Sequence, residues 1–375
     1  MLKTNPAVFA VGKFYQIIAL SGCESMMWVK IGGRCYYDHS NGILRSKKNV
    51  HKITVPMAEL DKAKKYTLCE SEIIERKPYF SETKEAKEYE YDFCPAEGEN
   101  LRAYQIADAH NLVEEPVKAA KAFGDFDFLI LNGDVPNHSG NLENFDNIYE
   151  ICDALTKGGK PVIFSRGNHD LRGIYAECIE DYTPTDGGKS YFTFTLGTVW
   201  GIVLDCGEDK PDRNKEYGNT ICCHAFREEE TEFIKEVIRN AEREYLKPEI
   251  KTRLVICHMP FTEGKNPPFN IEEDLYAEWG RLLKENIKPD AMLSGHNHQL
   301  YISYPGDGHD KLGHPCPVIV GSYIAKKENG SDEGADTPYG GYFAGCGIEI
   351  TEKSIKGKFT DSDGKTLEEF EIEKK

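Results

Sequence analysis

Five short polar motifs, each following an apolar run, constrain this chain more than any other feature of its sequence. Each run predicts a buried strand, and the runs cover residues 104–107, 126–131, 161–165, 253–257 and 291–294. The polar side chains that follow them are Asp108, His110, Asp134, Asn168, His169, Asp170, His258, His296 and His298. Because neighbouring strand ends in a layered α/β fold converge on one crevice, we expect these groups to meet at one sheet edge.

The chemistry of these side chains is that of metal ligands. Carboxylate and amide oxygens and imidazole nitrogens together suit divalent metal ions. In Asn132-Gly133-Asp134 the glycine permits a tight turn, and a single carboxylate can bridge two ions through its two oxygens. Ligands from five distant segments therefore predict a two-metal hydrolytic centre rather than one structural ion.

Each motif alone also has an ordinary structural interpretation. Asp108-Ala-His110 could be a solvated loop, and Asp134 could cap a helix. His258 could be a buried side chain with no ligand role, and residues 167–170 could be a polar turn. All five motifs in one order, each after a predicted strand, favour the metal site.

Three further residues are candidates for catalysis. His169 lies beside a predicted ligand and could donate a proton to a leaving oxygen, and Asp170 could hold its ring in orientation. Arg166 directly precedes this motif and is a candidate clamp for a substrate phosphate.

The amino-acid composition restricts the classes of molecule that this protein is expected to bind. The net charge of −17 disfavours binding of long nucleic acid, but bound metal ions would still attract a small phosphorylated substrate. No apolar run approaches the roughly 20 residues of a membrane span, so we expect no membrane partner. Residues 9–20 are weakly apolar, are interrupted at Gly12 and do not resemble a signal peptide, so we expect a cytoplasmic enzyme whose 12 cysteines are reduced.

The 375 residues predict two or three domains, and the pattern of predicted elements changes near residue 98. Before it, β-rich runs predict a small β-sandwich with one helix at residues 57–65. After it, strands alternate with predicted helices at 116–123, 142–155, 226–245 and 272–286, which implies parallel strands with helices outside. Residues 191–196 and 199–205 predict a hairpin, and residues 326–341 a long exposed loop.

At this point residues 101–350 resemble the calcineurin-like metallophosphoesterase superfamily. The matching motifs are Asp108/His110, Gly133-Asp134, Gly167-Asn168-His169, His258 and Gly295-His296-Asn297-His298. The resemblance implies an α/β fold, a four-layer α-β-β-α sandwich. It also implies two ions bridged by Asp134, and a hydroxide between them that attacks phosphate mono- or diesters. The first ion would be held by Asp108, His110 and His298, and the second by Asn168, His258 and His296. His169 would be the general acid or a phosphate contact, with Asp170 steadying it.

The domain order resembles purple acid phosphatases, with an N-terminal fibronectin-III-like β-sandwich over residues 1–98 and the catalytic domain over residues 99–375. The metal-binding tyrosine of those enzymes lies three residues after the bridging Asp, where this chain has Asn137. We therefore expect a colourless pair of divalent ions, Mn, Zn, Fe(II) or Mg.

The alternative is a scaffold protein that keeps the fold without catalysis. Substrate, oligomeric state and any protein partner stay open, since specificity is expected to depend on the loops at residues 136–141, 206–226, 261–271 and 326–342.

Overall fold

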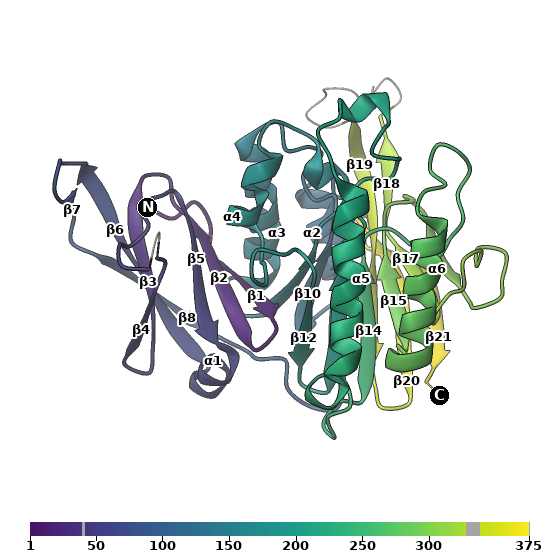
Figure 1. The fold of residues 1–375 in the computed structure, drawn as a ribbon. Coiled ribbons are helices and arrows are strands. Elements are labelled where there is room, and N and C mark those ends of the chain that lie inside the picture. The colour runs from purple at the N-terminus through teal and green to yellow at the C-terminus, as the bar shows by residue number, and fades with distance from the viewer. Residues whose placement is uncertain (40–41, 328–337, 375) are drawn as a thin grey trace.

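The computed structural model describes residues 1–39, 42–327 and 338–374. Two large β-sheets form the centre of the molecule (Figure 1). The ten-stranded sheet contains β1 (Ala7–Val11), β2 (Phe14–Leu20), β5 (Val50–Pro56), β9 (Leu101–Ile106), β10 (Phe128–Asn132), β11 (Pro161–Ser165), β18 (Tyr323–Lys326), β19 (Tyr339–Ile350), β20 (Ser354–Asp361) and β21 (Thr366–Glu373). The six-stranded sheet contains β12 (Phe192–Leu196), β13 (Val199–Leu204), β14 (Thr252–Cys257), β15 (Ala291–Ser294), β16 (Leu300–Ser303) and β17 (Val318–Gly321).

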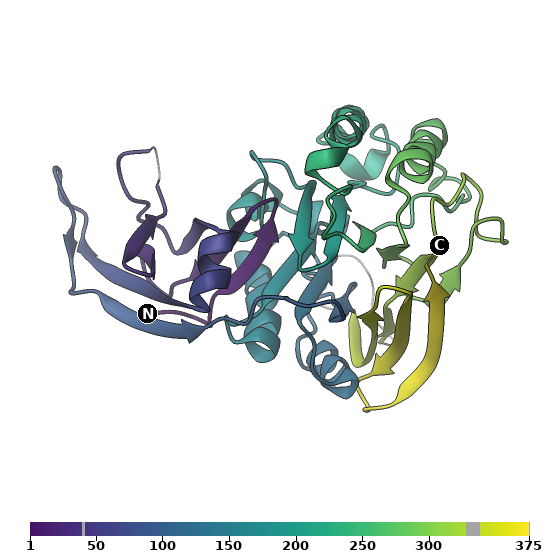
Figure 2. The ribbon, with the colours of Figure 1, turned by 90° about the horizontal axis from the view of Figure 1, so that it is seen from below.

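Helices cover the outer faces of both sheets, as Figure 2 shows from below. The helices are α1 (Met57–Ala63), α2 (Glu114–Phe123), α3 (Asp146–Thr156), α4 (Ile179–Tyr182), α5 (Cys223–Arg239) and α6 (Glu273–Leu282). Short helical turns add η1 (Leu142–Phe145), η2 (His169–Leu171), η3 (Ala176–Cys178), η4 (Lys215–Tyr217), η5 (Ala241–Arg243) and η6 (Leu283–Ile287).

Three apolar cores hold these layers together. Successive strand side chains point to opposite faces, so Ile130 of β10 packs between the sheets while Leu129 and Leu131 pack towards α2 and α3. On the outer face of the six-stranded sheet, Trp200 packs with Ile234 of α5. The layers follow as helix, sheet, sheet, helix, which confirms the predicted four-layer α/β sandwich.

The ligand-bearing motifs lie at one edge because their strands run in the same direction. Strands β9, β10 and β11 are parallel, and so are β13, β14, β15 and β17. At the carboxyl ends, the Gln105 side chain donates to the Ser294 carbonyl over 2.9 Å, and Asn132 donates to the Leu293 carbonyl over 3.0 Å. These bonds join the two sheets directly beneath the motifs.

The N-terminal region is divided between two sheets, which differs from the self-contained β-sandwich expected for residues 1–98. A five-stranded sheet contains β3 (Ser25–Ile31), β4 (Arg34–Tyr37), β6 (Lys65–Glu75), β7 (Glu82–Thr83) and β8 (Lys87–Asp92). Strands β1, β2 and β5 instead extend the ten-stranded sheet, where β1 pairs in parallel with β11. Every residue of β1 is buried, and an apolar strand of this kind is stable only when both of its faces are covered.

Most other expected elements are present. The five predicted helices correspond to α1, α2, α3 with η1, α5, and α6 with η6, although α5 ends at Arg239. Strands β12 and β13 form the predicted hairpin. Much of the loop expected at residues 326–341, and with it part of the 326–342 specificity loop, lies outside the described residues. None of the helices in the described ranges is long and apolar enough to span a membrane.

Candidate metal centre

The first ligand group lies between the two sheets. Asp108 and His110 follow β9, and His298 follows β15. Nε2 of His298 lies 3.3 Å from Oδ1 of Asp108 and 3.1 Å from Nε2 of His110. Ligands about 2.1 Å from a shared zinc-sized ion lie roughly 3.0–3.4 Å apart, so these three side chains have the spacing of a coordination sphere.

A second group lies beside the first. Nε2 of His258 lies 3.1 Å from Oδ2 of Asp134, and His296 completes a set whose ligand atoms are all within 4.8 Å of one another. Oδ1 of Asn168 is 3.0 Å from Nδ1 of His296. Asp134 also belongs to a third such set with His110 and His169. The structure therefore brings together all seven metal ligands expected from the sequence, with Asp134 between the two groups.

The backbone holds these ligands in an unusual conformation. Asp108, His110, Asp134, His296 and His298 all have positive φ, at 54°, 45°, 52°, 66° and 51°. This left-handed region is disfavoured for residues other than glycine, and such conformations cluster at functional sites where the surrounding structure enforces them. The backbone thus turns sharply just beyond the carboxyl ends of the strands, where these side chains come together.

Glycines in the motifs allow the ligand loops to approach closely. A Cβ at Gly133 would lie 2.6 Å from the His258 ring, and a Cβ at Gly167 would lie 2.2 Å from Oδ1 of Asp134. A Cβ at Gly295 would lie 2.6 Å from Oδ2 of Asp108. Any side chain at these positions would push a ligand away.

The cluster carries negative charge on two carboxylates and positive charge on one imidazole. Burial acts to raise the pKa values of Asp108 and Asp134, but the neighbouring His258 outweighs it and holds both below their usual range. Burial acts to lower the pKa of His258, but Asp134 and Asp108 raise it to about 10. Burial lowers the pKa of His110 to about 3 and that of His296 to about 4. The cluster thus pairs two anionic carboxylates with a protonated His258, while His110 and His296 are neutral near pH 7.

The donor set fits divalent cations. His258 Nε2 is buried and has no hydrogen-bond partner among the described residues, although it lies 3.1 Å from Asp134 and 3.7 Å from Asp108. An ion between the carboxylates would give this nitrogen a ligand role. The second ring nitrogen of two of these histidines has a partner that orients the ring. Nδ1 of His258 lies 2.7 Å from the Asn132 carbonyl oxygen, and Nδ1 of His110 lies 3.0 Å from Asn137 Oδ1.

His169 lines the same cavity, and two contacts fix its tautomer. Nδ1 lies 2.7 Å from the Asn137 carbonyl oxygen, which can only accept a hydrogen bond. Nε2 lies 3.0 Å from Nη1 of Arg172, which can only donate. The proton therefore sits on Nδ1, and Nε2 accepts from the guanidinium. In this arrangement the guanidinium of Arg172 occupies Nε2.

Asp170 does not hold the His169 ring as the sequence suggested. Its Oδ2 accepts from the Gly167 amide over 2.6 Å, while its backbone carbonyl accepts from Ser139. The carboxylate folds back on its own turn because the short η2 helix brings the Gly167 amide within reach. Burial, followed by the charge of Asp134, raises the pKa of Asp170 to about 8.

Arg166, the expected phosphate clamp, is engaged elsewhere. Its Nε donates to Oδ2 of buried Asp205 over 2.6 Å, and its guanidinium lies 5.5 Å from the centre of the Phe226 ring. It is absent from the residues that line the cavity in the described structure.

Among the residues that the sequence analysis did not single out individually, Arg172 and Tyr339 contact the centre. Arg172 is held by Glu208 at 2.8 Å and reaches His169; a cation just after the 167–170 motif was the available signal. Tyr339, within the 326–342 segment that was expected to affect specificity, stacks on His110 with ring centres 4.6 Å apart.

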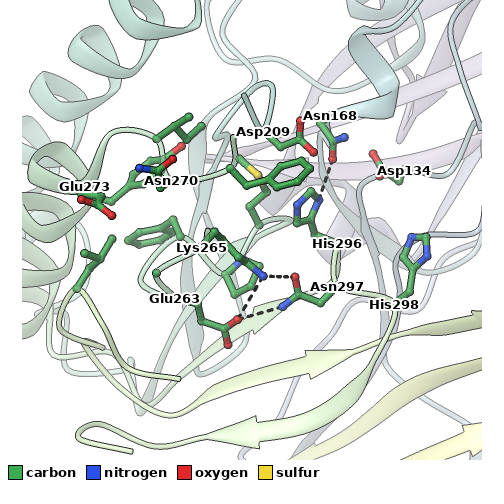
Figure 3. A pocket seen from close by; sticks show the side chains of 18 of the residues that line it. Asp134, Asn168, Asp209, Glu263, Lys265, Asn270, Glu273, His296, Asn297 and His298 are labelled. Atoms are coloured by element: carbon green, nitrogen blue, oxygen red, sulfur yellow. Dashed lines mark hydrogen bonds and ion pairs between the residues drawn. The ribbon is translucent and has the colours of Figure 1, made fainter. Parts of the chain in front are cut away.

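A cavity of about 350 Å³ opens from the metal centre (Figure 3). Asp134, Asn168, His169, His296 and His298 line one end. Apolar side chains line much of the rest, together with polar and charged ones that include Lys265, Glu263, Glu273 and Asp209. A substrate can therefore reach the ligand groups from solvent.

Comparison with known proteins identifies the family. The model for calcineurin-like phosphoesterases matches residues 101–300, more than half of the chain. The chain therefore belongs to the calcineurin-like phosphoesterase family, and this membership indicates metal-dependent phosphoester hydrolysis. No curated protein matches the chain.

One solved structure shares the fold over nearly the whole chain. A purple acid phosphatase from yellow lupin (Lupinus luteus) seeds superposes with a TM-score of 0.60 at 14% identity, over 98% of this chain and 74% of that one. A protein of Streptococcus pneumoniae TIGR4 described as a predicted phosphoesterase gives a TM-score of 0.33 at 12% identity, over 73% of this chain and 98% of that one. The first match shows that the resemblance in fold includes the N-terminal region.

Proposed function

We propose that this protein hydrolyses small phosphate mono- or diesters with two divalent ions bridged by Asp134. The observation that carries the proposal is the pair of ligand groups flanking Asp134 at the end of an open cavity. Asp108, His110 and His298 would hold one ion, and Asn168, His258 and His296 the other. Mn, Zn, Fe(II) and Mg all suit this mixture of oxygen and nitrogen ligands.

Two bound ions supply Lewis-acid stabilisation of phosphoryl oxygens and lower the pKa of water. The chain itself contributes position and protons. His169 faces the cavity and is the group available to contact the phosphoryl group or the leaving oxygen. Arg172 acts through His169, because its contact at Nε2 fixes where the ring points and which nitrogen carries the proton.

A non-catalytic scaffold is the second candidate, because family membership alone does not require turnover. The retained cavity and the full ligand set favour the enzyme. A scaffold has no need for five ligands in left-handed backbone conformations, which cost of order 1–3 kcal/mol each.

The test is a phosphatase assay with each divalent ion. The metal-depleted protein is reconstituted with Mn, Zn, Fe(II) or Mg and supplied with p-nitrophenyl phosphate and bis-p-nitrophenyl phosphate. The proposal expects hydrolysis of at least one substrate that is lost in Asp134→Asn. Asp186→Asn, in a turn whose residues are not among those lining the cavity, is the matched control. Tight metal binding with no hydrolysis of either substrate would establish the scaffold instead.

A further inference from the structure

The cavity continues well beyond the ligand groups. Its outer part, here called the side chamber, has walls of Met259, Pro260, Phe261, Phe269, Ile271, Tyr276 and Leu312. These residues come from the segment after β14, from the start of α6 and from the loop after β16. Phosphoester chemistry needs none of them, so their role lies with the organic part of the substrate.

Aromatic rings dominate the side chamber. The centres of the Phe261 and Tyr276 rings are 5.6 Å apart, and both side chains are buried. Phe269 is 41% exposed, so a large part of its surface is free to cover a ligand. Rings that are fixed in this way favour flat apolar groups, which stack or pack edge-on against them.

One polar wall of the cavity, formed by Glu263, Lys265 and Asn297, lies beside the metal centre (Figure 3). Nζ of Lys265 donates to Oδ1 of Asn297 over 2.5 Å and lies 3.8 Å from Oε2 of Glu263. Asn297 in turn donates to Glu263 over 3.0 Å. Asn297 sits between the ligands His296 and His298, so this wall is rigidly joined to the metal centre.

Charge in the side chamber opposes an anionic ligand group. Among the described residues that line the cavity, Glu263, Glu273 and Asp209 are acidic, and Lys265 is the one lysine or arginine. Glu263 already partners that lysine, and burial lowers the lysine's pKa. A second phosphate or a carboxylate in the side chamber would therefore meet an excess of negative charge.

We propose that the side chamber binds an uncharged aromatic group esterified to the phosphate, so that the preferred substrates are aryl or arylalkyl phosphoesters rather than phosphoesters of anionic compounds. This inference rests on the proposed function for the reaction, but the binding preference can be measured without turnover. Phe269, Phe261 and Lys265 are its specificity-determining residues.

The experiment measures binding of three non-hydrolysable phosphonates to the metal-reconstituted protein by calorimetry. Naphthylmethylphosphonate carries the aromatic group, methylphosphonate lacks it, and phosphonoacetate replaces it with a carboxylate. We expect naphthylmethylphosphonate to bind roughly tenfold or more tightly than methylphosphonate, as apolar pockets discriminate, and phosphonoacetate to bind most weakly. Phe269→Ala should remove most of the advantage. Leu246→Ala is the matched control, since Leu246 is 44% exposed and lies outside the cavity lining.

Equal affinity for the three phosphonates, or an aromatic preference unchanged in Phe269→Ala, would overturn the inference. Either result would leave the proposed function intact if p-nitrophenyl phosphate is hydrolysed. Conversely, an aromatic preference lost in Phe269→Ala, in a protein that hydrolyses neither p-nitrophenyl substrate, would support the side chamber as a binding site and reject the proposed reaction.

Discussion

Replacing Gly167 with alanine should disable the metal centre through one methyl group. The added Cβ would lie 2.2 Å from Oδ1 of Asp134 and 2.5 Å from its backbone nitrogen, whereas ordinary contacts begin near 3.4 Å. Gly167 does not have a positive φ, so alanine meets no backbone strain there and the contact alone is at issue. Asp134 would have to move by about 1 Å.

Both the affinity for metal and the rate should fall. A misplacement of about 1 Å typically costs about 10²-fold in rate, and overpacking costs about 1–3 kcal/mol of stability. We expect Gly167→Ala to lower kcat/KM by roughly 10²-fold and to weaken binding of at least one ion. Metal titration by calorimetry, kcat/KM for p-nitrophenyl phosphate and urea unfolding measure the three effects separately.

Gly308→Ala is the control for this substitution. A Cβ at Gly308 would have no atom within 4 Å, and that position also lacks a positive φ. It should change neither metal binding nor rate. If Gly167→Ala kept both ions and the full rate, then Asp134 would not be held where the structure has it, and the argument for a crowded, fixed bridging ligand would be refuted.

Four other predictions test different parts of the account. His169→Ala should keep both ions but lower kcat by roughly 10²–10⁴-fold. Because Arg172 acts through His169, the double variant with Arg172→Ala should lose no more than His169→Ala alone, and additive losses would contradict this. Deleting residues 1–93 should abolish cooperative unfolding followed by circular dichroism, since it removes β1, β2 and β5 from the ten-stranded sheet; a folded truncated protein would argue against that pairing. The reconstituted protein should be colourless because Asn137 replaces a tyrosinate, and a visible band bleached by reduction would restore an Fe(III) centre.

Local sequence patterns predicted the convergence of the ligands. Each motif follows an apolar run, and parallel strands bring their ends to one edge, so Asp108, Asp134 and His258 could be placed together from spacing alone. The conformations that direct these side chains, at positive φ for Asp108 and Asp134, could not be read from the residue types, because neither is glycine.

Pairing between distant segments was much harder to predict. Strand β1 lies against β11, with Phe9 opposite Val162, and nothing near residue 9 specifies that partner. The interruption at Gly12 is the turn between β1 and β2, where φ is 56°. The partner of a strand in a long-range pair depends on which sheet edge is free in the folded chain. A local sequence pattern does not specify that edge.

Side-chain contacts around the motifs were equally inaccessible. Adjacency in sequence suggested that Asp170 would orient His169. In the structure the turn directs the Asp170 carboxylate towards the Gly167 amide, and the His169 ring contacts Arg172 instead. Neighbours in a tight turn point in different directions, so sequence distance is a poor guide to contact at this scale.

Elemental analysis of the reconstituted protein tests the central claim most directly. The protein is depleted of metal, reconstituted with excess divalent ion, passed through a desalting column and measured by mass spectrometry alongside Asp134→Asn. Because two ligand groups share Asp134, we predict two ions per chain in the unmodified protein and loss of at least one in the variant. At most one tightly bound ion in the unmodified protein, with every divalent metal tried, would contradict the two-metal centre.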